Sequence, residues 1–565
     1  MYLILKENVI KYFSYLFILI SFSISLICTK ILLPQEIAVS GKIKRSEDGA
    51  YISREQNNQD VLHYEIHIEL FPATTSISAS VNIKMKYIDS ASSRVFLNLY
   101  QNLTIDSISC NSISLNTYKL YNRSLAVELN KYFSPNDTFN LSINYHGSPL
   151  NLGYSSFKFG EINGNSLIAT LSEPEFASTW LVCNDKPNDK ALVDMYITND
   201  KEKTSLSNGK LIETISTGNR KTFHWQTKYP ISTYLICLYS SQYEQIDEQW
   251  ASPEKDTLQL TYYAIPRHID KAKVDFKNHK RMLQFFSSVY GTYPFIMEKY
   301  GVAEFLWQSG AMENQTITGI GTNFIQGRGN VEDVLAHELA HHWWGNSVGP
   351  ETWKDIWLNE GFATYSEFLY ANFVDSTLSV GDRLNTYKSF MFDDPVYDPK
   401  NDMFSPTVYF KGAWIIHMLR NEIGDSLFFS VIHNYYDKYK YSNASTKDFI
   451  NIAETVSGKS LTQYFDQWLF SGSGKIILDY KWKYVDSDSK KQLCLSLKQV
   501  QQGYPCYKFN IDVFITNPTN GLVEKRIIDV SKTNQTIDLD IDYKPSKIEL
   551  DTQHKLLIEL QESIN

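Results

Sequence analysis

One stretch of the chain, Val331–Phe368, reads VEDVLAHELAHHWWGNSVGPETWKDIWLNEGFATYSEF. Near its start, His337 and His341 are four residues apart, and Glu338 directly follows the first histidine. Residues i and i+4 lie on the same face of a helix, so both imidazoles can reach one metal ion. Zinc suits two neutral histidines and a carboxylate, with a fourth position left for water. The stretch therefore predicts a zinc site, with Glu338 placed to hold that water.

The third zinc ligand is expected from Glu360, with eighteen residues between it and His341. Asn359 is a good N-cap residue and Ala363–Tyr370 favours a helix, so Glu360 falls in the first turn of a second helix. H-E-x-x-H with the glutamate as general base is the metallopeptidase pattern. For that motif alone, a surface histidine on an amphipathic helix remains the alternative interpretation of His341.

A third motif, Gly310-Ala311-Met312-Glu313-Asn314, lies upstream of these two. Together the three motifs, at these spacings, resemble the zinc aminopeptidases of the aminopeptidase N type, a family that also includes the leukotriene epoxide hydrolase. Tyr293-Pro294-Phe295 and Tyr409-Phe410-Lys411-Gly412-Ala413 match in the right order, and the resemblance covers residues 62 to 470 approximately. It implies a zinc-dependent aminopeptidase that removes the N-terminal residue from peptides. Glu338 would activate the zinc-bound water, and Tyr409 would donate to the oxyanion.

The resemblance also implies how the substrate is held. Glu173 lies in Thr170-Leu171-Ser172-Glu173-Pro174, which is similar to the family stretch T-Q-x-E-P. Leu171 replaces the family glutamine, so a polar contact in the pocket for the first residue is lost. Without the family match, Glu173 would be interpreted as a solvated loop carboxylate. Two carboxylates, Glu313 and Glu173, are expected to bind the free amino group of the substrate. The other expected substrate contacts come from the motif that contains Glu313, whose backbone would hold the peptide as an added edge strand: Gly310, Ala311, Met312 and Asn314.

The length of 565 residues predicts several domains in a multidomain α+β protein. Apolar residues alternate with period two across residues 56–265, which predicts an N-terminal all-β domain, saddle-like in the family. Residues 266–470 are mainly helical and would form a thermolysin-like catalytic domain. After a Ser/Gly linker, alternation returns in residues 475–565 and predicts a small C-terminal β-sandwich. The chain would then be a short form of the family, without its C-terminal helical domain.

Four finer expectations follow from the same patterns. Lys271–Tyr290 has apolar residues at helical spacing, and Tyr300–Phe305 is expected to be a strand. The stretch from Val374 to Asp402 is expected to be irregular surface. Cys494 and Cys506 lie off the apolar faces of two strands expected to be neighbours, so a cross-strand disulfide is left open.

The N-terminal residues 1–30 stand apart because Tyr12–Cys28 is apolar and is flanked by lysines. This pattern is typical of a signal peptide or a short membrane anchor, and the choice between the two stays open. Residues 31–55 would be a linker. We expect an exported protein that is secreted, periplasmic or anchored to a membrane, with the catalytic domain outside the cytoplasm.

The formal net charge of −9 is mild and no basic tract is present, which argues against a nucleic-acid partner. Three other interpretations of the motifs stay open: a zinc endopeptidase, a hydrolase of non-peptide substrates, and an inactive binding module. An endopeptidase would give Glu313 and Glu173 no role, and an inactive module would not need Glu338. The expected partners are peptides with a free N-terminus, and the expected cofactor is one zinc ion per chain.

Overall fold

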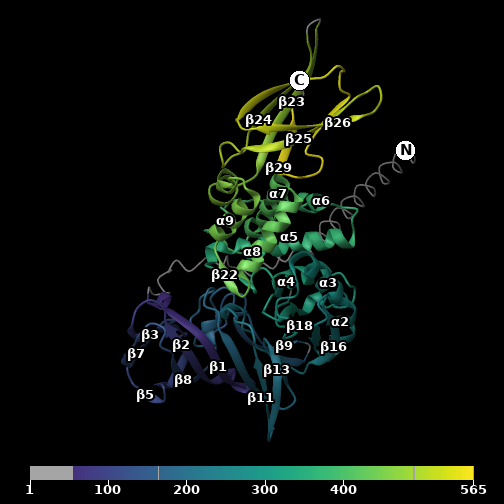
Figure 1. Ribbon diagram of the computed structural model, residues 1–565. Helices are drawn as coiled ribbons and strands as arrows, with labels where there is room; N and C mark the ends of the chain where they lie inside the picture. Colours follow the sequence, from purple (N-terminus) through teal and green to yellow (C-terminus); the bar gives the residue numbers. More distant parts are fainter. Residues whose placement is uncertain (1–54, 163, 309, 488–489, 564–565) are drawn as a thin grey trace, which may run out of the picture.

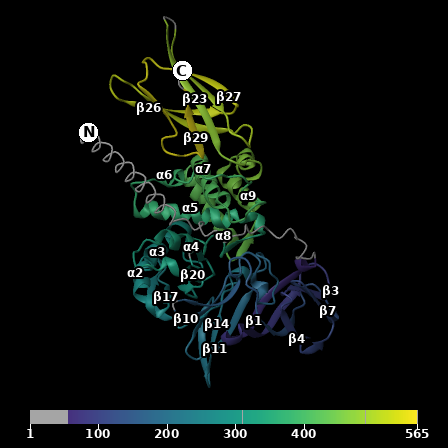
Figure 2. The same cartoon turned by 180° about the vertical axis from the view of Figure 1, so that it is seen from behind.

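The computed structural model describes residues 55–563, except for residues 163, 309, 488 and 489. A β-rich N-terminal part, a mainly helical middle part and a small C-terminal β part follow one another along the molecule (Figures 1 and 2). This arrangement confirms the predicted multidomain α+β organisation. The predicted signal or anchor in residues 1–30 lies outside the described residues. Within the described residues, no helix combines the length and the apolarity that crossing a membrane requires.

The N-terminal part is built on an eight-stranded sheet whose alternate residues are buried, as period two predicts. On its β1 strand Tyr64, Ile66 and Ile68 are buried. The strand order is β13 (Lys210–Thr217), β14 (Arg220–Gln226), β11 (Leu192–Asp200), β1 (Gln59–Phe71), β2 (Ser76–Tyr87), β8 (Phe139–Gly147), β4 (Leu103–Cys110) and β5 (Ile113–Leu115).

Two smaller sheets complete this part. The three-stranded sheet has the order β3 (Ser92–Asn98), β7 (Ser124–Phe133) and β6 (Tyr118–Tyr121). The four-stranded sheet has the order β12 (Thr204–Leu206), β15 (Tyr239–Ser241), β10 (Asn165–Thr170) and β9 (Phe157–Ile162). The end of β10 leads directly to Glu173.

A five-stranded sheet opens the middle part, in the order β16 (Glu244–Ala251), β17 (Thr257–Ala264), β18 (Tyr300–Phe305), β20 (Ile317–Gly321) and β19 (Ala311–Met312). β16 and β17 precede residue 265, yet β17 pairs with β18. The division predicted between residues 265 and 266 therefore falls between two strands of one sheet. Alternation in a sequence identifies a strand but not the sheet that it joins. The strand predicted at Tyr300–Phe305 is confirmed, and β19 forms an edge of this sheet.

Helices complete the middle part, and two of them carry the predicted zinc ligands, α4 (Glu332–Ala340) and α5 (Trp357–Val374). The others are α2 (Ile269–Asp275), α3 (His279–Tyr290), α6 (Val380–Asn385), α7 (Gly412–Ile423), α8 (Asp425–Tyr439), α9 (Thr446–Ser457) and α10 (Thr462–Phe465), with π-helical turns η8 (Thr407–Lys411) and η9 (Asp466–Phe470) and the short strand pair β21 (Val348–Pro350) and β22 (Ser442–Ala444). The helix predicted over Lys271–Tyr290 is thus two helices, interrupted at residues 276–278. The stretch expected to be irregular, residues 374–402, contains α6.

The C-terminal part has two sheets, in agreement with the predicted β-sandwich. One has the order β27 (Asn534–Asp540), β24 (Lys490–Gln499), β23 (Ile476–Ser487) and β29 (Ile558–Glu562), and the other has the order β26 (Val523–Val530), β25 (Phe509–Thr516) and β28 (Lys547–Leu550). Cys494 lies on β24 and Cys506 precedes β25, so they belong to different sheets, and both thiols are free. The disulfide that was left open between them is therefore not formed, because the two strands expected to be neighbours do not pair.

Candidate active site

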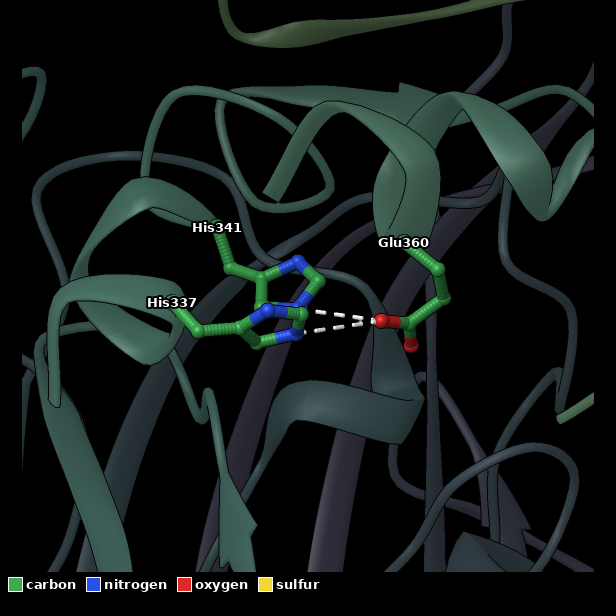
Figure 3. A group of neighbouring side chains, drawn as sticks. All are labelled: His337, His341 and Glu360. Atoms are coloured by element: carbon green, nitrogen blue, oxygen red, sulfur yellow. Dashed lines mark hydrogen bonds and ion pairs between the residues drawn. The ribbon is translucent and has the colours of Figure 1, made fainter. Parts of the chain in front are cut away.

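His337, His341 and Glu360 converge on one point between α4 and α5 (Figure 3). The two histidine Nε2 atoms lie 3.1 Å apart, and each lies 3.3 Å from Oε2 of Glu360. All three side chains are buried. Two imidazole nitrogens and one carboxylate oxygen that face a common point are a donor set that suits zinc. The residues present therefore fit the metal that the sequence predicts.

The start of α5 explains the position of Glu360. The helix begins at Trp357, two residues before the predicted cap Asn359, and Glu360 still lies in its first turn. The preceding turn is closed by a capping box in which Thr352 and Asp355 bond to each other's backbone. On the other side of Glu360, Gly361 lies against the backbone of Gly412, and a Cβ at Gly361 would be 3.0 Å from the carbonyl carbon there. A glycine at this position allows α5 and α7 to pack closely next to the predicted ligand.

The outer nitrogen of each histidine also has a polar neighbour, although only that of His341 makes a hydrogen bond. Nδ1 of His341 donates to the backbone oxygen of Trp344 at 3.0 Å, and Nδ1 of His337 lies 3.5 Å from Oε2 of Glu367. Such outer contacts fix which ring nitrogen faces a metal. Sequence reasoning missed Glu367. Its signal was the spacing of seven residues from Glu360, which is two helical turns on one face of α5.

Glu338 lies beside this cluster. One of its oxygens lies in a group with His341 and Glu313 whose atoms are all within 4.8 Å of one another. Its Oε2 is buried and has no hydrogen-bond partner among the described residues. Burial raises the pKa of Glu338 to about 8, although the neighbouring histidines oppose this shift. The side chain is therefore placed next to the ligands with one oxygen free to accept a proton.

Two more carboxylates join this cluster from different parts of the fold. Glu313 follows the edge strand β19, and Glu173 follows β10 of the N-terminal part. Their oxygens lie within 4.8 Å of each other and of a Glu360 oxygen. Both side chains are buried, and each has one oxygen without a hydrogen-bond partner in the described part of the chain. Burial raises the pKa of both groups. The charge of Glu313 adds to the shift of Glu173, and the charge of Glu360 adds to that of Glu313, whose shift the two histidines oppose.

The remaining predicted residues surround this group. Ala311 and Met312 form β19, with Gly310 just before it. The Asn314 side chain donates to the Tyr239 hydroxyl at 2.5 Å, which joins the motif to strand β15 of the N-terminal part. Asn346, which sequence reasoning missed, donates from Nδ2 to the backbone oxygen of Glu313 at 2.7 Å.

Tyr409 lies on η8, and its ring stacks on that of His337 with 5.9 Å between centroids. Burial raises the pKa of Tyr409, and the charge of Glu360 raises it further. The hydroxyl therefore keeps its proton and can donate it in a hydrogen bond. Leu171, at the position of the family glutamine, is buried.

Comparison with known proteins points to one family. The family model described as "Peptidase M1 N-terminal domain" matches residues 60–235, and the model described as "Peptidase family M1 domain" matches residues 274–468. The chain is 25% identical over 498 residues to a probable aminopeptidase 2 of Sulfurisphaera tokodaii, covering 81% of this chain and 60% of the relative. It is 28% identical over 478 residues to a glutamyl aminopeptidase of Bitis rhinoceros, covering 77% of this chain and 49% of the relative. The chain thus spans only about half to three-fifths of the length of these relatives.

Solved structures agree with this assignment. An M1 zinc metallopeptidase from Deinococcus radiodurans superimposes with a TM-score of 0.66 at 25% identity and covers 73% of this chain and 94% of that one. Aminopeptidase A of Legionella pneumophila, solved with aspartic acid, gives a TM-score of 0.78 over 90% of this chain and 60% of that one. Its 19% identity shows the shared fold alone.

Proposed function

Because this chain belongs to peptidase family M1, we propose that it is a zinc-dependent aminopeptidase that removes the first residue from peptides. The observation that carries this proposal is the convergence of Glu173 and Glu313 beside the cluster of His337, His341 and Glu360. With Glu338, four carboxylates lie in one buried cluster. Buried charges are costly unless they are paired. A divalent metal ion and the ammonium group of a peptide would compensate them.

His337, His341 and Glu360 would hold one zinc ion per chain. Zinc bound there would polarise the scissile carbonyl and lower the pKa of water. Glu338 would take the proton of the attacking water and pass it to the leaving amine, because it lies beside His341 and has one buried oxygen without a hydrogen-bond partner in the described part of the chain. Tyr409, which keeps its proton, would donate to the oxyanion that develops on the substrate.

Glu313 and Glu173 would make the enzyme an exopeptidase. A free α-ammonium group gains charge-assisted hydrogen bonds from these two carboxylates, and an internal peptide segment cannot supply such a group. The edge strand β19 would bind the peptide backbone beside them. The amino end of the substrate would then lie one residue away from the site of cleavage.

The test is hydrolysis of a chromogenic amino-acid amide and of its N-acetylated form. The wild type should cleave the free amine and strongly disfavour the acetylated substrate. Replacing Glu313 by Ala should raise KM for the free amine and narrow the ratio of the two kcat/KM values, because the acetylated group never made the contact. An unchanged ratio in Glu313→Ala, or equal cleavage of both substrates by the wild type, would remove the basis for an exopeptidase.

We also propose that the protein is exported. The support is the apolar run Tyr12–Cys28 with flanking lysines in the sequence. Separation of expressing cells into cytosolic, membrane and external fractions tests this proposal. Recovery of the enzyme only in the cytosol would contradict it.

A further inference from the structure

A cavity of about 600 Å³ lies where strand β9 of the N-terminal part meets the middle part of the molecule. The two parts are in close contact there, because a Cβ at Gly160 on β9 would lie 3.0 Å from the side chain of Leu306. In both views this pair of strands, β9 and β10, lies beside the sheet that contains β18 (Figures 1 and 2). We call this cavity the cationic cleft, after three of the residues that line it, Lys158, Lys271 and Arg328.

The charge of the cationic cleft is not balanced by its own lining. Glu161 is its only carboxylate against these three cations. Among the ion pairs of the described residues, none joins Lys158, Lys271 or Arg328 to an acidic partner. The chain as a whole carries a formal charge of −9, so this local excess of positive charge is unusual for the molecule. An anionic ligand would supply the missing partner.

Two carboxylates behind the lining shape the cationic cleft and leave its cations free. Asp275 accepts hydrogen bonds from the backbone N–H groups of residues 327–329, at 2.7 to 2.9 Å. The fully buried Glu304 accepts from the Ile265 backbone at 3.0 Å and from the Thr322 hydroxyl at 2.8 Å. Both carboxylates are thus engaged in hydrogen bonds with residues at or next to the lining. Those of Asp275 fix the backbone of the loop that carries Arg328 without a ligand.

The cationic cleft lies in the direction that a bound peptide would take. A peptide with its amine at Glu313 can extend only back along Met312, Ala311 and Gly310, because β19 ends at Met312. β19 runs antiparallel to β20, so this path leads to the carboxyl end of β20 at Gly321. The two residues that follow it, 322 and 323, line the cationic cleft.

Side-chain contacts join the two sites as well. Trp307 packs on Tyr154 with 5.5 Å between ring centroids. Tyr154 lies near enough to Glu173 and Glu360 that their charges, after burial itself, raise its pKa. The chain neighbours of Trp307, Leu306 and Gln308, line the cationic cleft. One aromatic pair therefore separates the active-site carboxylates from the cleft.

We propose that the cationic cleft binds a carboxylate of the peptide substrate downstream of the cleaved bond. This carboxylate is either the C-terminus of a short peptide or an acidic side chain of a later residue. The inference rests on the proposed aminopeptidase function and adds to it the kind of peptide preferred. The backbone from Glu313 to Gln308 spans at most about 17 Å if extended, which corresponds to a peptide of about five residues.

The experiment compares kcat/KM for pentapeptides that differ in one carboxylate. One pair has a free or an amidated C-terminus, and the other pair is amidated and has Glu or Gln at the fourth position. The wild type should favour the carboxylate in at least one pair by about fivefold or more, the range for a partly exposed ion pair with more than one cation. The double variant Lys158→Gln/Arg328→Gln should reduce this preference to about onefold.

Two controls accompany the double variant. Lys273→Gln removes a lysine from the same helix as Lys271, at a position that does not line the cationic cleft, and should keep the preference. A single amino-acid amide is too short to reach the cationic cleft, so all variants should cleave it at the wild-type rate.

The outcomes separate the two proposals. Which of the two peptide pairs loses its preference identifies the source of the carboxylate. If the wild type cleaves the amino-acid amide but shows no carboxylate preference, or if the double variant retains the preference, the cationic cleft has no role in substrate binding and the proposed function stands. If the wild type cleaves neither the amide nor any peptide, the proposed function fails and the inference fails with it.

Discussion

Glu338 is buried next to the predicted zinc ligands, yet one of its oxygens has no hydrogen-bond partner among the described residues. Glu338→Gln keeps the size of the side chain and removes the base. We expect kcat to fall at least about 100-fold, the usual minimum for loss of a general base. Metal content, measured by elemental analysis, should not change, because His337, His341 and Glu360 remain.

A matched control lies on the same helix. Glu332 is bonded to Arg281, Tyr370 and Asn278, none of which is a predicted site residue. Glu332→Gln is therefore expected to keep kcat within about twofold, because it changes no contact of the site. Near wild-type turnover by Glu338→Gln with metal bound would show that another group acts as the base.

At the residue scale, the sequence predicted the residues of the site better than the residues that position them. His337, His341 and Glu360 come from motifs with fixed spacing, and the structure brings them together. Glu367 and Asn346 belong to no such motif. Each contacts a site residue that is distant in the sequence, His337 for Glu367 and Glu313 for Asn346. Their roles depend on side-chain geometry, which a spacing rule does not contain.

At the scale of elements, the period of apolar residues predicted strands and helices well and their partners badly. β16 and β17 were expected in the N-terminal domain, and they join the sheet of the middle part instead. The disulfide left open between Cys494 and Cys506 does not form for the same reason, since β24 and β25 belong to different sheets. Burial of alternate residues is a local property of a strand, whereas sheet membership depends on contacts between distant parts of the chain.

Lys190 joins the N-terminal part to the residues before β21 and to β22. Its ammonium group donates to three backbone oxygens of the middle part, those of Asn346 at 2.7 Å, Ser347 at 2.9 Å and Ser442 at 2.8 Å. Asn346 in turn holds the backbone of Glu313. The N-terminal part is therefore linked, through two residues, to the carboxylate proposed to bind the substrate amine.

Replacing Lys190 by Gln should disturb this link. The shorter side chain cannot reach all three backbone oxygens. The free energy of unfolding should therefore fall by about 1 to 3 kcal/mol, because some of these oxygens lose their donor. KM for an amino-acid amide should rise more than kcat falls, because Glu313 acts in binding. Lys186→Gln is the matched control, since Lys186 contacts the Asn57 side chain at an exposed position. Equal effects of the two substitutions, or a change confined to kcat, would contradict a role in placing Glu313.

At the scale of the whole molecule, stability against pH depends on buried acids outside the site. Asp189 is buried in the N-terminal part and accepts from the backbone of Val61 at 3.1 Å and from the side chain of Asn184. Burial raises the pKa of Asp189 to about 7. The unfolded chain would release this proton near its ordinary pKa of about 3.9. Between these two values the folded state binds more protons than the unfolded state.

Stability should therefore fall as pH rises from about 4 to about 7, by up to ~4 kcal/mol for this one group. Asp189→Asn removes the titration, so the variant should lose this part of the pH dependence and gain stability relative to the wild type at pH 8. The measurement is the midpoint of thermal unfolding at pH 5 and at pH 8 for both proteins. Asp437→Asn, at an exposed position on α8, is the control and should leave the slope of the wild type intact. If Asp189→Asn and the wild type lose the same stability between pH 5 and pH 8, then Asp189 is already ionised in the folded protein at pH 5, and its burial is compensated by Asn184 and Val61.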